Sequence, residues 1–190
     1  MFYHGTTLEN ARKLLNGGEK ESSVWFCSFD DYLYVWSRDE IKKEFDEDAD
    51  PSETESLCLQ MAFESAQITA AASENPQSIL VVLEFDFPEA DVYDDLSCEN
   101  MEMARRVDTT QLDGLDLENS LLNIYTAKHN SRLDAFYLCG LQNNAYFNWN
   151  MVDKDLKDAV KTINEREIYL EPTYFEPYII TLTELNKFKP

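Results

Sequence analysis

Two periods of hydrophobic and polar residues follow one another along the chain, and each predicts a different kind of element. Residues 78–87 (SILVVLEFDF) form a continuous apolar run that ends in alternation, which is typical of a buried strand. Shorter apolar runs predict further strands, at residues 2–3, 24–27, 135–141, 167–170 and 178–182. We expect Glu167 to open the strand at 167–170.

Apolar residues spaced three and four positions apart predict the helices. In residues 8–15 this spacing follows Thr6, which together with Glu9 matches a capping box, and Gly17-Gly18 ends the pattern. Further helices are predicted from Ser28 or Asp30 to about Lys43 and at residues 54–72, 118–128 and 153–163. The helix at 54–72 is expected to bury a face made of Leu57, Met61, Ile68 and Ala72.

Strands separated by helices predict an α+β fold around one core. The chain has 190 residues, of which 44% are hydrophobic, and this length suits one well-packed domain. Because no internal repeat or linker is visible, we expect a single domain over residues 1–190. The sequence shows no apolar run that could span a bilayer and no signal peptide, so a cytoplasmic protein without a membrane anchor is expected.

The net charge of the chain limits the classes of molecule that it is expected to bind. The chain contains 37 acidic and 16 basic residues, which gives a formal net charge of −21. Such a field repels phosphate backbones and anionic lipids, so direct binding to nucleic acid or to a membrane is disfavoured. A basic protein partner suits this charge, although solubility alone would also explain it.

Cysteines and acidic runs give no sign of a metal site or a disulfide framework. The four cysteines are scattered without a CxxC pair, which favours reduced thiols. Asp46, Asp48 and Asp50 imitate the start of a calcium loop, but Pro51 stands at the required glycine and Leu57 at the required glutamate. No metal is therefore expected.

Three short motifs, in this order along the chain, resemble the ADP-ribosyltransferase superfamily. Residues 3–6 (Tyr-His-Gly-Thr) resemble the His-Gly-Ser/Thr strand of poly(ADP-ribose) polymerases, diphtheria-toxin-like transferases and RNA 2′-phosphotransferases. Residues 24–27, with Trp36 eleven positions after Trp25, are similar to the second strand and following helix of the polymerase group. Residues 165–167 (Glu-Arg-Glu), before an apolar run, resemble the catalytic glutamate strand.

This resemblance implies a split antiparallel β core with flanking helices, and NAD as the substrate. In such enzymes a carboxylate stabilises the positive charge that develops on the ribose as its bond to nicotinamide breaks. Glu167 takes this role if the Glu-x-Glu pattern of the arginine-modifying toxins applies, and Glu165 takes it if the polymerase spacing applies. His4 is expected to hydrogen-bond the other ribose, and the Gly5 backbone to pair with the nicotinamide carboxamide.

The remaining expected NAD contacts come from aromatic, hydroxyl and basic side chains. Trp25 and Trp36 would enclose the nicotinamide ring, and Thr6 would complete the strand that binds NAD. Since NAD is itself an anion, Arg12 or Arg38 would offset the charge of this acidic chain.

The expected activity is mono-ADP-ribosyl transfer to a protein or another cellular acceptor, as in a toxin or effector. Trp25 stands where the polymerases have tyrosine, which favours single transfer or NAD hydrolysis over polymer elongation. One alternative is a catalytically silent domain of this fold that binds a basic partner or mimics nucleic acid. Another is an RNA 2′-phosphotransferase, which needs a basic groove. The motif residues also allow purely structural roles, with His4 and the tryptophans packed in the core and the glutamates on the surface.

Overall fold

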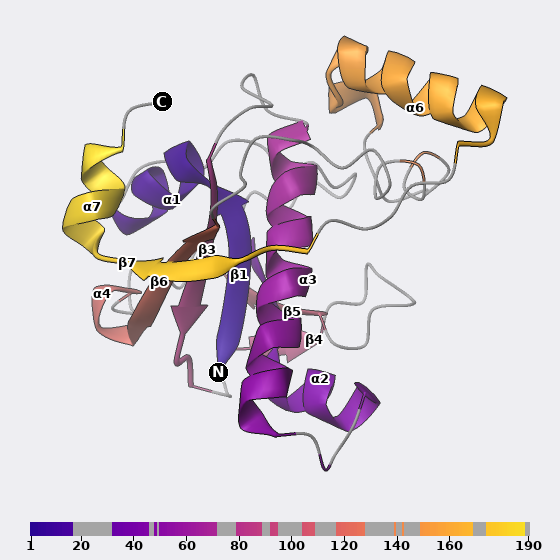
Figure 1. Ribbon diagram of the computed structural model, residues 1–190. Coiled ribbons are helices and arrows are strands. Elements are labelled where there is room, and N and C mark those ends of the chain that lie inside the picture. Colours follow the sequence, from indigo (N-terminus) through magenta and orange to yellow (C-terminus); the bar gives the residue numbers. More distant parts are fainter. Residues whose placement is uncertain are drawn as a thin grey trace.

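A seven-stranded sheet with helices against both of its faces forms the described part of the protein, seen here in a computed structural model (Figure 1). The structure describes residues 1–16, 32–45, 48, 50–71, 79–88, 92–94, 104–108, 117–127, 139, 142, 149–168 and 174–188. The strands expected at 24–27 and 135–141 lie outside these ranges, apart from the single residue Cys139.

Helices packed on an antiparallel sheet confirm the α+β class. The strands are β1 (Phe2–Thr7), β2 (Tyr32–Ser37), β3 (Leu80–Phe85), β4 (Val92–Asp94), β5 (Ala104–Asp108), β6 (Leu121–Ala127) and β7 (Pro177–Ile180). The helices are α1 (Leu8–Leu15), α2 (Arg38–Phe45), α3 (Pro51–Ala71), α4 (Leu117–Ser120), α6 (Lys154–Arg166) and α7 (Leu182–Lys187), with a 3-10 turn η3 (Trp149–Met151).

The sheet has the order β4-β5-β2-β1-β3-β6-β7, and every neighbouring pair is antiparallel. β1 pairs with β3 along its whole length, from Phe2 to Thr7. Its pairing with β2 is much shorter: among the described residues only Phe2↔Ser37 and Tyr3↔Trp36 are matched. In the part of the chain that the structure describes, the sheet thus consists of two blocks, β4-β5-β2 and β1-β3-β6-β7, whose matched pairs lie near the start of β1.

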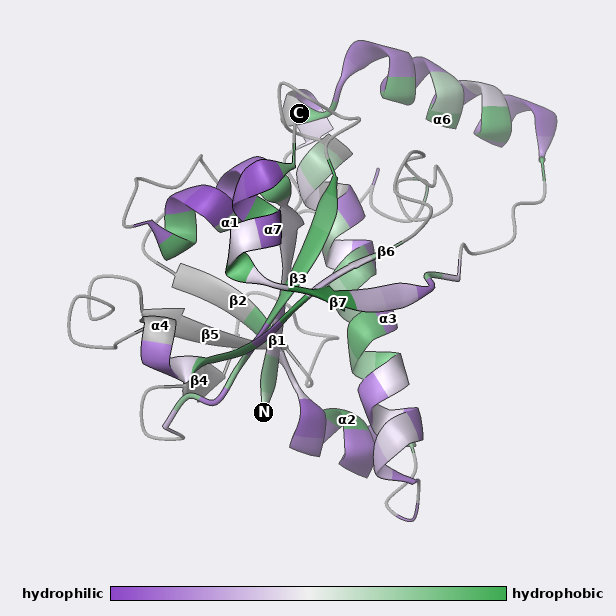
Figure 2. Ribbon diagram, turned by 60° about the vertical axis from the view of Figure 1, so that its left-hand side comes forward, coloured by the Kyte–Doolittle hydropathy of each residue, from purple (hydrophilic) through white to green (hydrophobic). Residues whose placement is uncertain are grey.

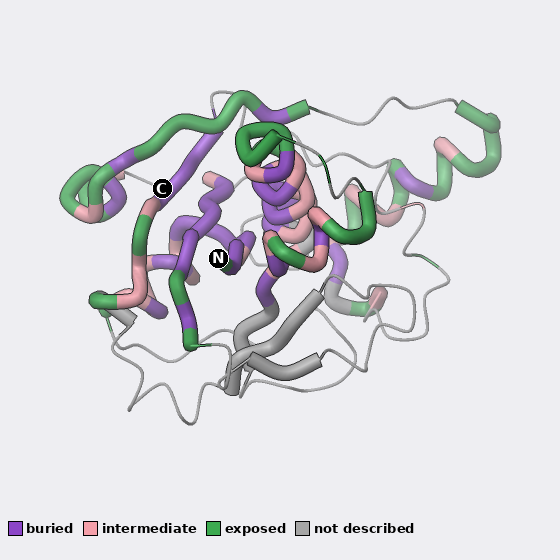
Figure 3. The backbone as a smooth tube through the Cα atoms, turned by 90° about the horizontal axis from the view of Figure 1, so that it is seen from below, coloured by how far each residue is buried: buried purple, intermediate pink, exposed green. Residues whose placement is uncertain are grey.

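Each face of the sheet has its own apolar core. On one face, Val81, Leu83 and Phe85 pack with residues of α1 and α7, including Leu8 and Leu185. On the other face, the central strands pack against α3. Figure 2 shows α1 and α7 on one side of β1 and β3, and α3 on the other. Buried positions are concentrated in the central strands and along α3, whereas α6 and α7 carry many exposed ones (Figure 3).

Helix α3 lies unusually close to β1, because small residues meet at the crossing. The helix begins at Pro51, whose missing N–H is not needed in a first turn, and it contains no further Pro or Gly. Ala62 and Ala66 face the sheet and are fully buried. A Cβ atom at Gly5 would lie 1.6 Å from the carbonyl oxygen of Ala62. Only glycine therefore fits at this position of β1.

Several elements confirm the sequence-based predictions. β1, α1, α3, β3, α6 and β7 all form where the hydrophobic pattern placed a strand or helix, within a few residues at their ends. One detail differs at the first helix: the N-cap is Thr7, whose side chain accepts from the Asn10 backbone N–H at 3.3 Å. Thr6, the expected cap, is instead a buried strand residue.

Two predicted helices are wrong over much of their length. The segment expected to be helical up to Lys43 forms strand β2 through Ser37 and becomes helix α2 only afterwards. Aromatic and β-branched residues fill β2, and pairing with β1 and β5 favours the extended form over any helical spacing. In the same way, residues 121–127 of the expected helix at 118–128 form β6 between β3 and β7.

Among the described residues, no helix is both long and apolar enough to cross a membrane. The described residues also contain no group of three or more His, Cys, Asp or Glu side chains that could hold a metal ion. Cys58 is a buried free thiol.

Candidate functional site

His4 lies in the middle of β1, on the face of the sheet opposite α3. It is matched with Leu83 on β3, and the row continues through Ile124 on β6 to Ile180 on β7. Directly opposed residues of antiparallel strands share a face, and these three partners all belong to the core under α1 and α7. His4 itself is half-buried. Its side chain therefore lies beside an apolar surface rather than in the core.

The Gly5 backbone points toward the junction of the two blocks. The Arg38 N–H donates to the Met1 carbonyl (3.1 Å), and the Leu8 N–H donates to the Ile79 carbonyl (2.8 Å). Along β1, odd-numbered residues thus direct their backbone groups toward β2, and even-numbered residues direct them toward β3. Gly5 is odd-numbered, and the described β1–β2 pairs end at Tyr3. Its N–H and C=O consequently point beyond the last β1–β2 pair, next to His4.

Trp36 does not share a face with His4. It is matched with Tyr3, packs with the core under α3, and donates from Nε1 to the Ser65 Oγ at 2.9 Å. The expectation that Trp36 sits on a helix is thus corrected: it lies on β2, and α3 packs against the face that it shares with Tyr3. Trp25 lies outside the described residues.

Neither candidate glutamate lies on a strand. Glu165 is an exposed residue in the last turn of α6, 3.8 Å from Lys161 Nζ. Glu167 is the exposed C-cap of α6, with a left-handed φ of 50°, and its N–H donates to the Ile163 carbonyl. The strand expected to open at Glu167 is wrong at this residue, because the helical spacing of residues 154–166 continues up to it.

Figure 1 shows α6 set apart from the sheet, so the structure does not bring Glu165 or Glu167 next to His4. Of the expected site residues, it brings together His4, Gly5 and Thr6 on β1. The first and third share the face under α1 and α7, where Thr6 is matched with Val81.

Both arginines that were expected to offset the charge of NAD make structural contacts. Arg12 donates from Nη2 to the Leu185 carbonyl at 2.7 Å and also to the Phe188 carbonyl, which ties α1 to the end of α7. Arg38 donates to the Pro51 carbonyl at 3.0 Å, which ties α2 to the start of α3. The positive charge of Arg12 lies at the C-terminal end of α7, where it complements the helix dipole, whereas Arg38 acts through its hydrogen bond to the first residue of α3.

A buried carboxylate that the sequence-based reasoning missed lies on the α3 face. Glu84 on β3 is only 4% exposed and accepts from the Tyr3 hydroxyl (3.0 Å), the Tyr125 hydroxyl (2.9 Å) and the Asn123 amide (2.6 Å). The Tyr125 hydroxyl also lies 3.2 Å from the Glu55 carboxylate of α3. This network connects three strands and the helix above them. The charged residue within the apolar stretch LVVLEF (residues 80–85) was the signal that could have located it.

Burial and the neighbouring carboxylate keep the donors of this network protonated. Burial, and then Glu84, raise the pKa of both Tyr3 and Tyr125 far above the ordinary value of 10.0. Burial likewise raises the pKa of the nearby Cys58 thiol to about 12. The cluster therefore offers hydrogen-bond donors rather than a nucleophile, and its evident role is to hold α3 against the sheet.

Comparisons with models of protein families, with curated proteins and with solved structures find no match to this chain. A function has to be argued from the geometry of the described residues and from the chemistry that this geometry permits.

Proposed function

We propose that the chain is an NAD-dependent mono-ADP-ribosyltransferase that holds NAD along β1. One observation carries the proposal: the Gly5 backbone N–H and C=O point beyond the last β1–β2 pair, and the half-buried His4 is the next residue. A primary carboxamide carries one acceptor oxygen and an NH₂ donor, so it complements this pair of backbone groups. Nicotinamide would bind there, and the His4 imidazole would hydrogen-bond the adjacent ribose.

The shape of the sheet supports the same proposal. Two antiparallel blocks whose described pairs meet at Phe2 and Tyr3 agree with the split core that the resemblance implies. β1 also delivers its His-Gly-Thr motif directly into α1, as the motif requires. The face of β1 that carries His4 is turned away from α3 and lies on the side of α1 and α7, where His4 itself is half-buried.

The proposed reaction breaks the bond between ribose C1′ and the nicotinamide nitrogen. The electron pair of this bond passes to the positively charged ring, which leaves as neutral nicotinamide. A lone pair of the acceptor then forms the new bond at C1′, and the acceptor releases a proton. A carboxylate close to C1′ lowers the barrier because the sugar carries positive charge in between.

The origin of this carboxylate is the part of the proposal that needs a residue-by-residue test. Glu167 and Glu165 remain the candidates from the resemblance, although both lie at the exposed end of α6. A Gln substitution at each position removes the charge while conserving size.

Nicotinamide release from NAD tests the proposal. The protein should be used without an N-terminal tag, because His4 is the fourth residue. We expect release by the unmodified chain, a large loss in His4→Ala, and loss in either Glu165→Gln or Glu167→Gln. Glu44→Gln on α2 is the matched control, because Glu44 is likewise exposed and is not part of β1 or α6.

The second candidate is a catalytically silent domain of the same architecture. The exposure of Glu165 and Glu167 on a helix set apart from the sheet favours it. In that case NAD cleavage is absent, with or without cell lysate, and no Glu→Gln variant changes the result. Absence of both NAD cleavage and NAD binding by calorimetry would overturn the transferase proposal.

A further inference from the structure

The last strand of the described sheet presents apolar side chains to solvent, and among the described strands its outer edge has no neighbour. β7 ends the strand order, and in it Ile179 is 60% exposed. Just before it, Tyr174 is 80% exposed, the largest exposed fraction among the described large hydrophobic residues. Exposed apolar residues beside a strand at the edge of a sheet are a recurrent site of protein recognition.

The outer side of β7 offers backbone hydrogen bonds at Ile179. The hydrogen bond from the Leu8 N–H to the Ile79 carbonyl shows which residues of β3 direct their backbone groups toward β1. Because these directions alternate along each antiparallel strand, it also determines which residues of β6 and β7 direct theirs toward the neighbouring strand. Carried through β3 and β6, this alternation places the backbone groups of Tyr178 and Ile180 against β6. The N–H and C=O of Ile179 therefore face away from the sheet, where an added strand would pair with them.

The segment before β7 is held rigidly against α3. Gln60 accepts from the Phe175 N–H at 2.9 Å and donates to the Phe175 carbonyl at 2.8 Å. The Phe175 ring stacks on Phe63, with centroids 5.0 Å apart. Because Phe175 points inward, its neighbours Tyr174 and Glu176 are presented outward on an ordered backbone.

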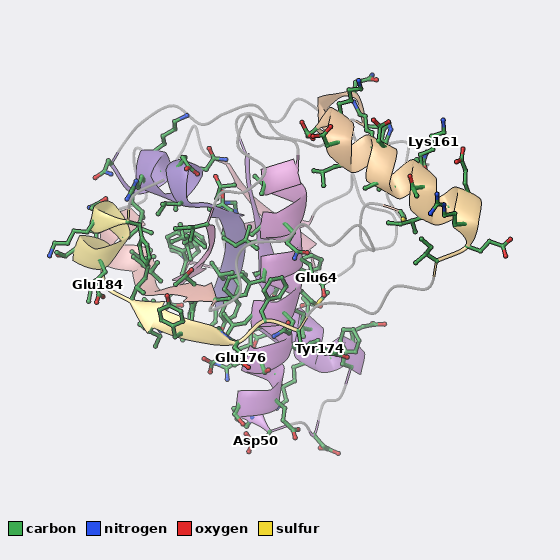
Figure 4. All side chains as sticks on the ribbon, turned by 45° about the horizontal axis from the view of Figure 1, so that its top comes forward. Asp50, Glu64, Lys161, Tyr174, Glu176 and Glu184 are labelled. Carbon is green, nitrogen blue, oxygen red and sulfur yellow. The ribbon has the colours of Figure 1, made fainter. Side chains whose placement is uncertain are left out.

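Acidic residues lie next to this crossing. Glu64 stands four positions after Gln60, so the two share one face of α3, and the segment crosses that face at Gln60. Figure 4 shows the crossing, with Tyr174 and Glu176 on either side of α3 and Glu64 beside it. The 21 residues of α3 include no Lys or Arg, so the charged side chains of this helix are all negative.

We infer that this β7 surface (Tyr174, Ile179, Glu64 and Glu176) binds a short extended segment of a basic partner protein. The apolar part and the outward Ile179 backbone would pair with an extended chain. The tyrosine ring and the two carboxylates would take up Arg or Lys side chains, by cation–π contact and by charge pairing. At about 3.3 Å per residue, the stretch from Tyr174 to Ile179 matches a segment of about six residues.

Charge complementarity selects this occupant over a second copy of the chain. Each copy carries a net charge of −21, so two copies that meet at an acidic surface repel one another. The inference concerns binding alone, and it holds whether or not the chain cleaves NAD.

Fluorescence anisotropy with a labelled peptide of alternating arginine and valine, about six residues long, tests it on the full chain. The matched probe of alternating glutamate and valine has the same length and the same apolar residues. We expect saturable binding of the basic peptide only. Tyr174→Ala should weaken this binding by about threefold, which is the effect of one exposed cation–π contact.

Ile179→Thr keeps a β-branched residue but removes apolar surface, and Glu176→Gln removes one charge; both should weaken binding as well. Phe45→Ala and Glu44→Gln on α2 are the controls, since both residues are exposed and lie outside the β7 surface. Circular dichroism on each variant verifies folding.

Equal binding by all variants would show that the net charge alone attracts the peptide, and would overturn the inference. Failure to bind the basic peptide would overturn it too. A third result would also overturn the inference: a dimer, detected by light scattering, that Ile179→Lys converts to a monomer. In that case a second copy of the chain would occupy the β7 surface.

Discussion

At the scale of single residues, Gly5 carries two separate demands. Its missing side chain makes room for the Ala62 carbonyl of α3, and its backbone points past the end of the β1–β2 pairing. Gly5, which resembles the glycine of an NAD-binding motif, is therefore also required for the packing of α3 against β1. The sequence motif alone could not reveal this, because the contact comes from a helix that lies far along the chain.

Gly5→Ala should destabilise the protein by about 3 kcal/mol, because the new methyl group cannot avoid the Ala62 carbonyl without a backbone shift. Urea unfolding measures the change in the free energy of unfolding. Thr183→Ala, at an exposed position of α7, is the control. An unchanged free energy of unfolding in Gly5→Ala would show that α3 does not press on β1 as described.

The tyrosines of the Glu84 network predict a loss of stability at high pH. The pKa values of Tyr3 and Tyr125 are raised in the folded state above the ordinary 10.0, by burial and then by Glu84. As pH rises above about 10, the unfolded tyrosines ionise while the folded ones do not, so the free energy of unfolding falls. This contribution is fully present below that pH.

Urea unfolding at about pH 8 and about pH 11 measures the fall, which should be smaller in Tyr125→Phe than in the unmodified chain. Tyr178→Phe, at an exposed position of β7, should not alter it. A fall of equal size in Tyr125→Phe would mean that other groups cause it.

At the scale of elements, the hydrophobic pattern correctly predicts long or fully buried segments. It fails where pairing with neighbouring strands determines whether a segment becomes a strand or a helix. β3 and α3 were predicted because their patterns are long and continuous. β2 and β6 were predicted as helices, since their pairing partners lie far away in the sequence. Glu167 was predicted to open a strand, although a helix ends there.

The buried face of α3 shows the same limit within one helix. The pattern predicted a buried face of Leu57, Met61, Ile68 and Ala72. Leu57 and Met61 are only half-buried, and Cys58 and Ala62 face the sheet instead. Because α3 approaches Gly5 closely, small side chains are needed at the contact. A pattern search based on large apolar residues does not detect such positions. For the candidate site, His4 and Gly5 could be placed from sequence, whereas the separation of Trp36 and the glutamates from them could not.

The contact between the first and last helices predicts a measurable coupling. Arg12→Ala removes the hydrogen bonds to the Leu185 and Phe188 carbonyls and should loosen α7, at a cost of about 1–2 kcal/mol. Hydrogen exchange followed by mass spectrometry should show faster exchange in α7. Arg166→Ala, at the exposed end of α6, is the control. Unchanged exchange in α7 would contradict the proposed tie between the two helices.

At the scale of the whole molecule, an acidic chain is proposed to bind an anionic substrate. Arg12 and Arg38 contact helix ends, so the described part of the chain would hold NAD mainly through backbone groups of β1 and through His4. The net charge of −21 would instead attract the basic partner that is proposed to bind at the β7 surface. The two proposals thus assign opposite electrostatic characters to two places on one molecule.

The NMR chemical shift of the Gly5 amide, followed as NAD is added, tests the central claim most directly. The chain contains five glycines and a single His-Gly step, His4-Gly5, so ¹⁵N-glycine together with ¹³C-carbonyl-histidine labelling identifies the Gly5 amide by NMR. We predict that NAD and free nicotinamide each shift this signal, whereas ADP-ribose, which lacks the carboxamide, shifts it far less. A Gly5 signal that stays in place while NAD shifts other residues, or while NAD has no effect at all, would contradict the account.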